Sequence, residues 1–176
     1  RPYEDIVYDR LGMLYLAKER FNDAAETFNA FVEQNPYHAQ APAFQMRVIE
    51  TYQQGRFPTL VLEGKQQFVE RYSTQGDYWK RHALEDNPEI SDHLKSSLTE
   101  LSRHYHALAQ RSRKDEDYQQ AIHWYRSYLD SFPDSDEAAM VNFLLAETLF
   151  ESGNYLLATR EYENTAYNHG DHEKAA

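Results

Sequence analysis

The stretch that decides the fold is residues 8–36, YDRLGMLYLAKERFNDAAETFNAFVEQNP, because its pattern of aromatic, small and proline residues returns later in the chain. Residues 105–133, YHALAQRSRKDEDYQQAIHWYRSYLDSFP, match it position for position at an offset of 97 (8 to 105, 36 to 133). Another copy lies 37 residues after the second, around Ala146, and a weaker one lies 36 residues after the first, around Val48. Recurrence at such a period indicates a stack of repeated supersecondary units.

The order of residue types within each copy has a physical cause. A first helix needs a small residue, Gly12 in the first copy, where a second helix crosses close by, and the second helix supplies its own small residue, Ala24. The aromatic Phe28 follows one turn further along the same face and is expected to pack into the next pair. Pro36 then ends the second helix, because proline donates no backbone hydrogen bond and disfavours helix in the residue before it. Each copy is therefore predicted to be a pair of helices.

These residues resemble the tetratricopeptide repeat family, and the resemblance covers most of the chain. It implies an all-α fold in which about four helix pairs stack as a right-handed α-α superhelix, a solenoid, within one domain over 1–176. The expected repeats span 4–36, 39–72, 91–133 and 136–170, with an irregular insertion at 73–90. Residues from about 171 resemble the opening of a further repeat, so we expect the natural sequence to continue with a fifth repeat beyond Ala176.

The insertion contains two large aromatic residues, Tyr78 and Trp79, between turn signals at Gly76 and at Asn87. Two interpretations stay open: these rings fill a gap beside the weak second repeat, or they contact a ligand. Filling a gap is the favoured interpretation, since buried aromatic side chains mostly pack.

Composition narrows the classes of partner. The chain of 176 residues carries a formal net charge of −11, which disfavours nucleic acid because the phosphate backbone would be repelled. There is no Cys, so disulfides, zinc–thiolate sites and cysteine nucleophiles are excluded. No apolar run approaches the ~20 residues that span a bilayer.

No motif in the chain points to catalysis, a cofactor or a metal. Among the eight His, His104 and His106 are two residues apart and diverge by about 200° on a helix, so they cannot chelate together. His169 and His172 have a chelating spacing but lie in the expected turn between repeats. A glycine-rich phosphate loop and a recognisable nucleophile context are both missing. We therefore expect no enzyme activity, no cofactor and no native metal site.

The family resemblance implies where a partner binds, because the first helix of each pair lines the concave groove in that family. Carried onto this sequence, the lining positions in the first two repeats are Asp9, Met13, Leu16, Gln45, Ile49 and Tyr52. Those in the last two repeats are Arg103, His106, Gln110, Arg113, Met140, Phe143, Glu147 and Phe150. Such a groove is apolar at both ends and basic in the third repeat, where Arg103 and Arg113 either clamp a carboxylate or pair with local acids.

The leading hypothesis is a protein-interaction scaffold that binds a peptide or a partner subunit in this groove. The periods of 36 and 37, longer than the roughly 34 typical of the family, are similar to bacterial envelope members such as the Bam-complex lipoprotein and the Tol-Pal accessory protein. That similarity implies a periplasmic or outer-membrane-associated setting, with the cytoplasm as the alternative. Two other hypotheses stay open: a structural spacer or self-association element acting through an uncapped C-terminal end, and an accessory domain in polysaccharide export.

Overall fold

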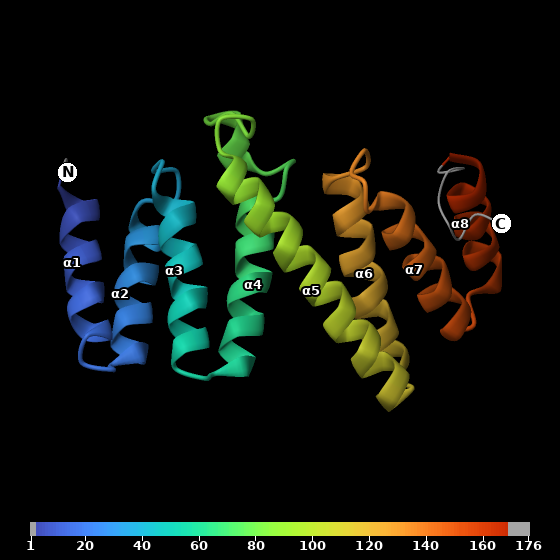
Figure 1. Cartoon of the computed structure of the whole chain (residues 1–176), viewed down its shortest axis with the longest axis horizontal. Helices are drawn as coiled ribbons and strands as arrows, with labels where there is room; N and C mark the ends of the chain where they lie inside the picture. The colour runs from blue at the N-terminus through green and yellow to red at the C-terminus, as the bar shows by residue number, and fades with distance from the viewer. Residues whose placement is uncertain (1–2, 169–176) are drawn as a thin grey trace. The chain divides into compact units, whose positions relative to one another are not determined.

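Helices follow one another along the whole of the described chain. The computed structural model describes residues 3–168, which form α-helices and one short 3₁₀ helix and contain no strand (Figure 1). The elements are α1 (Glu4–Leu16), α2 (Phe21–Gln34), α3 (Ala41–Gln54), α4 (Pro58–Tyr72), η1 (Asp77–Lys80), α5 (Pro88–Ser112), α6 (Asp115–Ser131), α7 (Ala138–Glu151) and α8 (Tyr155–Asn168). The all-α solenoid class predicted from the repeats is confirmed for this part of the chain.

Each helix pair is closed by a turn that contains one left-handed residue. Glu19, Arg56, Arg113 and Gly153 have φ angles of 55°, 60°, 57° and 84°. In the α1–α2 turn the amide of Arg20 donates to the carbonyl of Tyr15 at 3.0 Å. In the α7–α8 turn the amide of Asn154 donates to the carbonyl of Leu149 at 2.9 Å. A left-handed residue after a helix closes its last carbonyls with such bonds and reverses the chain within a few residues. The two helices of a pair therefore lie antiparallel (Figure 1).

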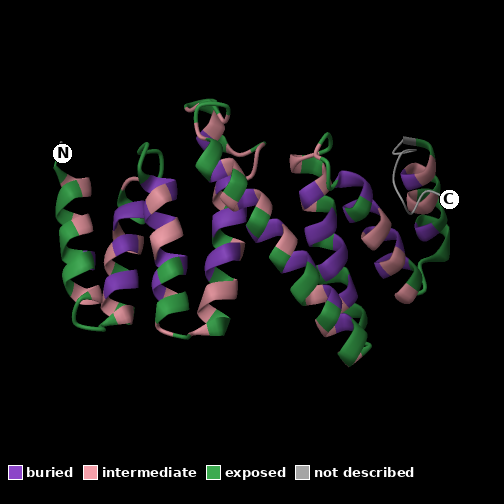
Figure 2. Ribbon diagram, in the orientation of Figure 1, coloured by how far each residue is buried: buried purple, intermediate pink, exposed green. Residues whose placement is uncertain are grey.

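The core of the first compact unit of the chain, Arg1–Ser97, forms where a missing side chain lets α1 approach α2. Gly12 lies so close to Phe28 that a Cβ at position 12 would be 2.1 Å from the ring atom Cε1. The rings of Phe28 and Phe31 also have centroids 5.9 and 4.2 Å from that of Phe44 in α3. The buried surfaces of α2 and α3 gather where these helices meet (Figure 2). Phe28 therefore packs into the next pair, as the spacing predicted.

The insertion at 73–90 packs onto the first unit. Tyr78 of η1 is buried, with its ring centroid 5.1 Å from that of Tyr72 and its hydroxyl donating to the carbonyl of Ala39 at 3.4 Å. Trp79 donates from Nε1 to the carbonyl of Tyr72 at 2.9 Å. Both aromatic residues fill space beside α4, which favours the packing interpretation over ligand contact. The following helix, α5, begins at Pro88, three residues before the predicted start of the third repeat at 91.

The second unit repeats the small-residue contacts of the first. Its four small contact residues are all fully buried, namely Ala109, Ala121, Ala146 and Ala158. Between the last two helices, the Asn142 side-chain amide donates to the Glu161 carbonyl and to the Thr165 hydroxyl, both at 2.8 Å. This amide fixes α7 against α8 at the position where earlier repeats use an aromatic ring, Tyr8 or Tyr105.

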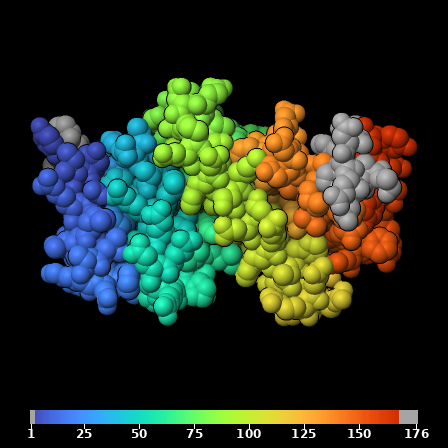
Figure 3. Space-filling view, in the orientation of Figure 1, coloured from blue at the N-terminus to red at the C-terminus, as the bar shows by residue number. Residues whose placement is uncertain are grey.

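The chain has two compact units, Arg1–Ser97 and Leu98–Ala176, and the single domain over 1–176 stays a prediction. The boundary falls inside α5, because the insertion extends this helix to 25 residues and its first part packs on α4. There the ring centroids of Phe68 and His93 lie 4.6 Å apart. Within each unit, side chains fill the spaces that the ribbons leave open (Figure 3). The predicted fifth repeat near 171 lies outside the described residues.

Candidate partner-binding surfaces

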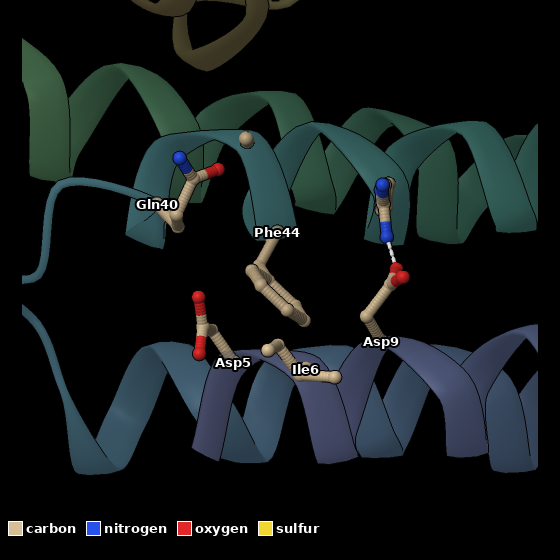
Figure 4. Close-up of a pocket in the computed structure, with 7 residues that line it drawn as sticks. Asp5, Ile6, Asp9, Gln40 and Phe44 are labelled. Carbon is tan, nitrogen blue, oxygen red and sulfur yellow. Dashed lines mark ion pairs between the residues drawn. The ribbon is translucent and has the colours of Figure 1, made fainter. Parts of the chain in front are cut away.

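A recess of about 180 Å³ opens between α1 and α3 in the first unit. From α1 and from the start of α3 it is lined by Asp5, Ile6, Asp9, Gln40, Ala43, Phe44 and Arg47 (Figure 4). The guanidinium of Arg47 forms an ion pair with the carboxylate of Asp9 across the recess. The Phe44 ring extends from α3 toward α1 between these polar groups (Figure 4). The recess therefore combines an aromatic wall with a charged rim.

A larger recess of about 450 Å³ borders the same helix. It is lined by Ala39, Gln40, Ala43, Met46, Arg47 and Glu50, and by residues 86–90 before and at the start of α5. The two recesses share Gln40, Ala43 and Arg47, so they form one continuous surface, which we call the α3 face.

The α3 face is acidic. Its lining includes the five carboxylates of Asp5, Asp9, Glu50, Asp86 and Glu89 and one guanidinium, that of Arg47. The ion pair with Arg47 neutralises Asp9. The lining also contains apolar side chains, among them Met46 and Ile90. A surface of this kind attracts positive charge at a distance and offers apolar contact at close range.

Two residues predicted to line the groove in the second repeat, Gln45 and Ile49, are misplaced, because both are fully buried. Ile49 packs against α4, where its Cγ1 would lie 3.0 Å from a Cβ at Gly64. The error is one of register: α1 begins at Glu4 and α3 at Ala41, which are 37 residues apart (41 − 4), whereas the predicted positions rest on an offset of 36. One residue turns a helix by about 100°. The slip of one residue therefore assigned two core residues to the predicted surface.

The offset of 37 identifies lining residues that the offset of 36 did not predict. Carried by 37 positions, Asp9 and Met13 correspond to Met46 and Glu50, and both of these line the α3 face. A signal for this register is present in the sequence, since Tyr15 and Tyr52 are also 37 residues apart. The weaker match at Phe57, where the offset from Phe21 is 36, obscured it. No repeat signal marks Arg47 or the residues at 86–90. The residues at 86–90 line the α3 face because they belong to the insertion.

The other predicted residues of the first unit differ in exposure. Asp9 lines the smaller recess and Met13 is exposed. Leu16 and Tyr52 pack against the buried cluster that contains Phe28, so only part of each faces solvent. Burial raises the pKa of the Tyr52 phenol.

In the second unit the predicted groove residue His106 is also buried. Its Nδ1 lies 3.0 Å from the Tyr125 hydroxyl and 3.4 Å from the Thr148 hydroxyl, and its Nε2 lies 3.3 Å from Oε2 of Glu151. The imidazole thus joins α5 to α6 and α7. A side chain held by three partners inside the core is a packing and hydrogen-bonding residue, which corrects its predicted exposure in the groove.

Arg103, Gln110 and Arg113 are exposed, as groove residues must be. Gln110 donates to Oε1 of Glu151 at 2.9 Å, next to the buried imidazole. Arg113 stands in the turn after α5 and its Nη1 donates to the Tyr118 hydroxyl at 3.4 Å. Arg113 therefore has a local partner on α6, which is a phenol and not one of the local acids. The carboxylate clamp with Arg103 and the pairing with local acids both stay predictions.

The four predicted residues on α7 lie on one side of the helix. Met140 and Phe150 are exposed, and Phe143 and Glu147 are half-buried. The Phe143 ring lies 5.9 Å from that of Tyr162, whose hydroxyl donates to the Glu147 carboxylate. Burial and this carboxylate together raise the pKa of Tyr162. The Phe150 ring, although exposed, lies 5.1 Å from that of Tyr155 at the start of α8. Three of the four side chains thus contact α8, and Met140 stays available to a partner.

Within residues 3–168, no group of three or more His, Asp or Glu side chains is arranged to hold a metal ion. No helix of this described part has the length and apolar character needed to cross a membrane.

The recurring helix pairs, their small-residue contacts and an exposed face on the first helices define a helical-repeat scaffold. The family model described as "Tetratricopeptide repeat" matches residues 10–58 and 106–176, more than half of the chain. The chain therefore belongs to the tetratricopeptide repeat family, whose members generally mediate protein–protein interactions. Among solved structures it is similar to "Crystal structure of MamA protein", with 13% identity over 97% of this chain and 94% of that chain and a TM-score of 0.36. No curated protein matches the sequence.

Proposed function

We propose that the chain is a non-catalytic scaffold whose α3 face binds a basic, extended segment of a partner protein. The observation that carries this proposal is the pair of joined recesses around Ala43, of about 180 and 450 Å³, bordered by an excess of carboxylates. Both recesses are open to solvent, so side chains of a peptide can enter them. Charge complementarity raises the association rate and selects against acidic partners.

The choice of a basic segment rests on the balance of charge on this face. After Asp9 pairs with Arg47, the lining retains the carboxylates of Asp5, Glu50, Asp86 and Glu89. An acidic peptide would meet like charge at each of these positions. A Lys or Arg side chain would place its apolar stem against Met46 or Ile90 and its charged end at the rim.

Binding to an array of synthetic peptides tests the proposal, with basic, neutral and acidic members of equal length and apolar content. We expect the basic peptides to bind and Ala43→Trp, which fills the space shared by both recesses, to abolish that binding. The matched control is Asn22→Trp at an exposed position of α2, remote from the lining residues, and it should bind like the wild type. Equal binding of acidic peptides, or full binding by Ala43→Trp, would refute the role of this face.

The proposal extends to a setting in the bacterial cell envelope, in an assembly of the periplasm or outer membrane. The repeat period of 37, longer than the roughly 34 typical of the family, supports this extension. Fractionation of the producing cells, with detection of the native protein, tests it independently of peptide binding. Recovery in the cytoplasmic fraction alone would reject the envelope setting and leave the α3 face as a peptide-binding surface.

A further inference from the structure

The side chain of Arg47 lies where the two recesses of the α3 face meet. Among the described residues that line either recess, Arg47 alone carries a positive charge, and it lines both of them. Its guanidinium pairs with the carboxylate of Asp9 on α1 (Figure 4). The ion pair therefore extends from α3 to α1 and occupies part of the surface that a bound segment would contact.

The guanidinium of Arg47 lies over two aromatic rings as well as beside a carboxylate. Its Cζ is 5.6 Å from the ring centroid of Phe44 and 5.8 Å from that of Phe28. A cation within about 6 Å of a ring centroid is attracted by the face of the ring. A planar guanidinium combines this stacking with paired hydrogen-bond donors, whereas the ammonium group of lysine is a compact, strongly hydrated charge. Asp9, Phe28 and Phe44 thus offer the chemistry of an arginine-binding site, and a residue of the chain itself fills it.

The other repeats show that the packing of the helix pairs does not require an arginine at this position. Carried along the repeats (47 to 10, 10 to 107, 107 to 144), position 47 corresponds to Arg10, Ala107 and Leu144. The helices that contain Ala107 and Leu144 form without a charge there. The side chain of Arg47 is therefore free to leave the ion pair without loss of a contact that the repeats share.

The ion pair is also accessible to an incoming side chain. The side chains of Arg47 and Asp9 are 41% and 39% exposed. Ion pairs at such exposure contribute little to stability. An arginine that enters from a partner would restore the contacts that Arg47 gives up, and the displaced guanidinium lies one turn from Glu50 on the same helix, where it gains a new carboxylate partner.

We propose that Asp9, Phe28 and Phe44 form an arginine subsite of the α3 face, filled by Arg47 in the free protein and by an arginine of the bound segment in the complex. This inference rests on the proposed function and deepens it, because it names arginine rather than lysine as the residue that the segment presents to the smaller recess. Arg47 then acts as an internal competitor that lowers the affinity for the partner.

Binding of two synthetic basic peptides tests the subsite. The peptides are identical except that one position is arginine in the first and lysine in the second, and fluorescence anisotropy gives the ratio of their two dissociation constants, in which the effect of net charge cancels. Arg47→Ala removes the internal competitor, so the affinity for the arginine peptide should rise about fivefold more than that for the lysine peptide. Addition of Asp9→Asn to Arg47→Ala should abolish this selective gain.

Arg10→Ala is the matched control, because it removes the same charge at the equivalent repeat position. Arg10 is exposed on α1 and lies outside the lining of both recesses, so this variant should keep the wild-type ratio. Circular dichroism and thermal unfolding check the fold of each variant, and Ala107 at the equivalent position predicts that Arg47→Ala folds. Arg47→Gln, which keeps the apolar stem but removes the charge, should shift the ratio in the same direction.

The outcomes separate this inference from the proposed function. If the wild type binds basic peptides but Arg47→Ala leaves the ratio unchanged, or if the selective gain survives Asp9→Asn, the arginine subsite is wrong and the proposed function stands without it. If only Arg47→Ala binds the arginine peptide, the subsite stands and the proposed function fails for the wild type. If neither protein binds a basic peptide, both are overturned.

Discussion

The hydroxyl of Tyr125 lies 3.0 Å from Nδ1 of His106, at the point in the second unit where α5, α6 and α7 meet. The other ring nitrogen of His106 lies 3.3 Å from Glu151 on α7. One imidazole therefore joins three helices through side chains whose contacts the repeat spacing does not predict. Polar groups in such a network are costly to leave without partners, because little water reaches them.

Replacing Tyr125 by Phe should change how stability depends on pH. Burial raises the pKa of Tyr125 from 10.0 to about 12, with a smaller contribution from Glu151 and an opposing one from Arg103. The folded state therefore favours the neutral phenol, so its contribution to stability is complete below about pH 10 and is lost as pH rises through about 12. Two units of pKa correspond to roughly 3 kcal/mol. Urea unfolding at a series of pH values should show a smaller alkaline decline in the free energy of unfolding for Tyr125→Phe than for the wild type.

Tyr167→Phe is the control for that experiment, because it removes a hydroxyl from an exposed ring. Its alkaline decline should match that of the wild type. A Tyr125→Phe curve parallel to the wild-type curve between about pH 10 and 12 would show that Tyr125 ionises as easily in the folded as in the unfolded chain.

Gly12→Ala should destabilise the first unit although alanine favours helix. The gain in helix propensity is about 1 kcal/mol, but a Cβ at position 12 would lie 2.1 Å from Phe28 Cε1. Overpacking of this kind costs about 1–3 kcal/mol, so a net loss of roughly 1 kcal/mol is expected. Urea unfolding measures the loss, and Phe28→Leu in the Gly12→Ala background should recover part of it through a coupling between the two sites. Equal or greater stability of Gly12→Ala would show that α1 and α2 separate without cost.

The fold was predictable because it depends on positions that every helix pair must share. Gly12, Ala24 and Phe28 recur at fixed spacing, and packing of one helix on the next leaves little freedom there. The candidate surface was less predictable because the surface positions carry no such constraint. Gln45 and Ile49 were misplaced by a one-residue slip, which a strong repeat would have prevented.

Other features of the site depend on contacts that no repeat encodes. His106 occupies a position equivalent to Asp9, yet its side chain is buried and lies within hydrogen-bond distance of Tyr125 and Glu151. The residues at 86–90 reach the α3 face only because the insertion folds onto the first unit through Tyr78. Insertions and polar networks of this kind are particular to one chain, so periodicity gives no information about them.

Gln45→Met should stabilise the protein, because the buried side-chain amide of Gln45 has no hydrogen-bond partner among the described residues. Leaving such a group unsatisfied costs about 1–3 kcal/mol, and methionine fills a similar volume without polar atoms. We expect the free energy of unfolding to rise by about 1 kcal/mol in urea titrations. Gln53→Met, at an exposed position of the same helix, should change it by less than about 0.5 kcal/mol. A large loss of stability in Gln45→Met would mean that the amide has a partner in solution, such as a water molecule.

Glu50→Lys should weaken the binding of a basic peptide to the α3 face, whereas Gln45→Met should not, because Gln45 is buried and Glu50 lines the larger recess. Reversing one exposed charge is expected to change the affinity by about 1 kcal/mol, mostly through the association rate. The difference between Glu50→Lys and the wild type should shrink as salt is raised, since exposed charges are screened over about 10 Å at 0.1 M. Surface plasmon resonance with one basic peptide at several salt concentrations measures both effects. Glu63→Lys, exposed on α4 outside the recess lining, carries the same change in net charge and is the control. If Glu63→Lys weakened binding as much as Glu50→Lys, total charge rather than the α3 face would govern recognition.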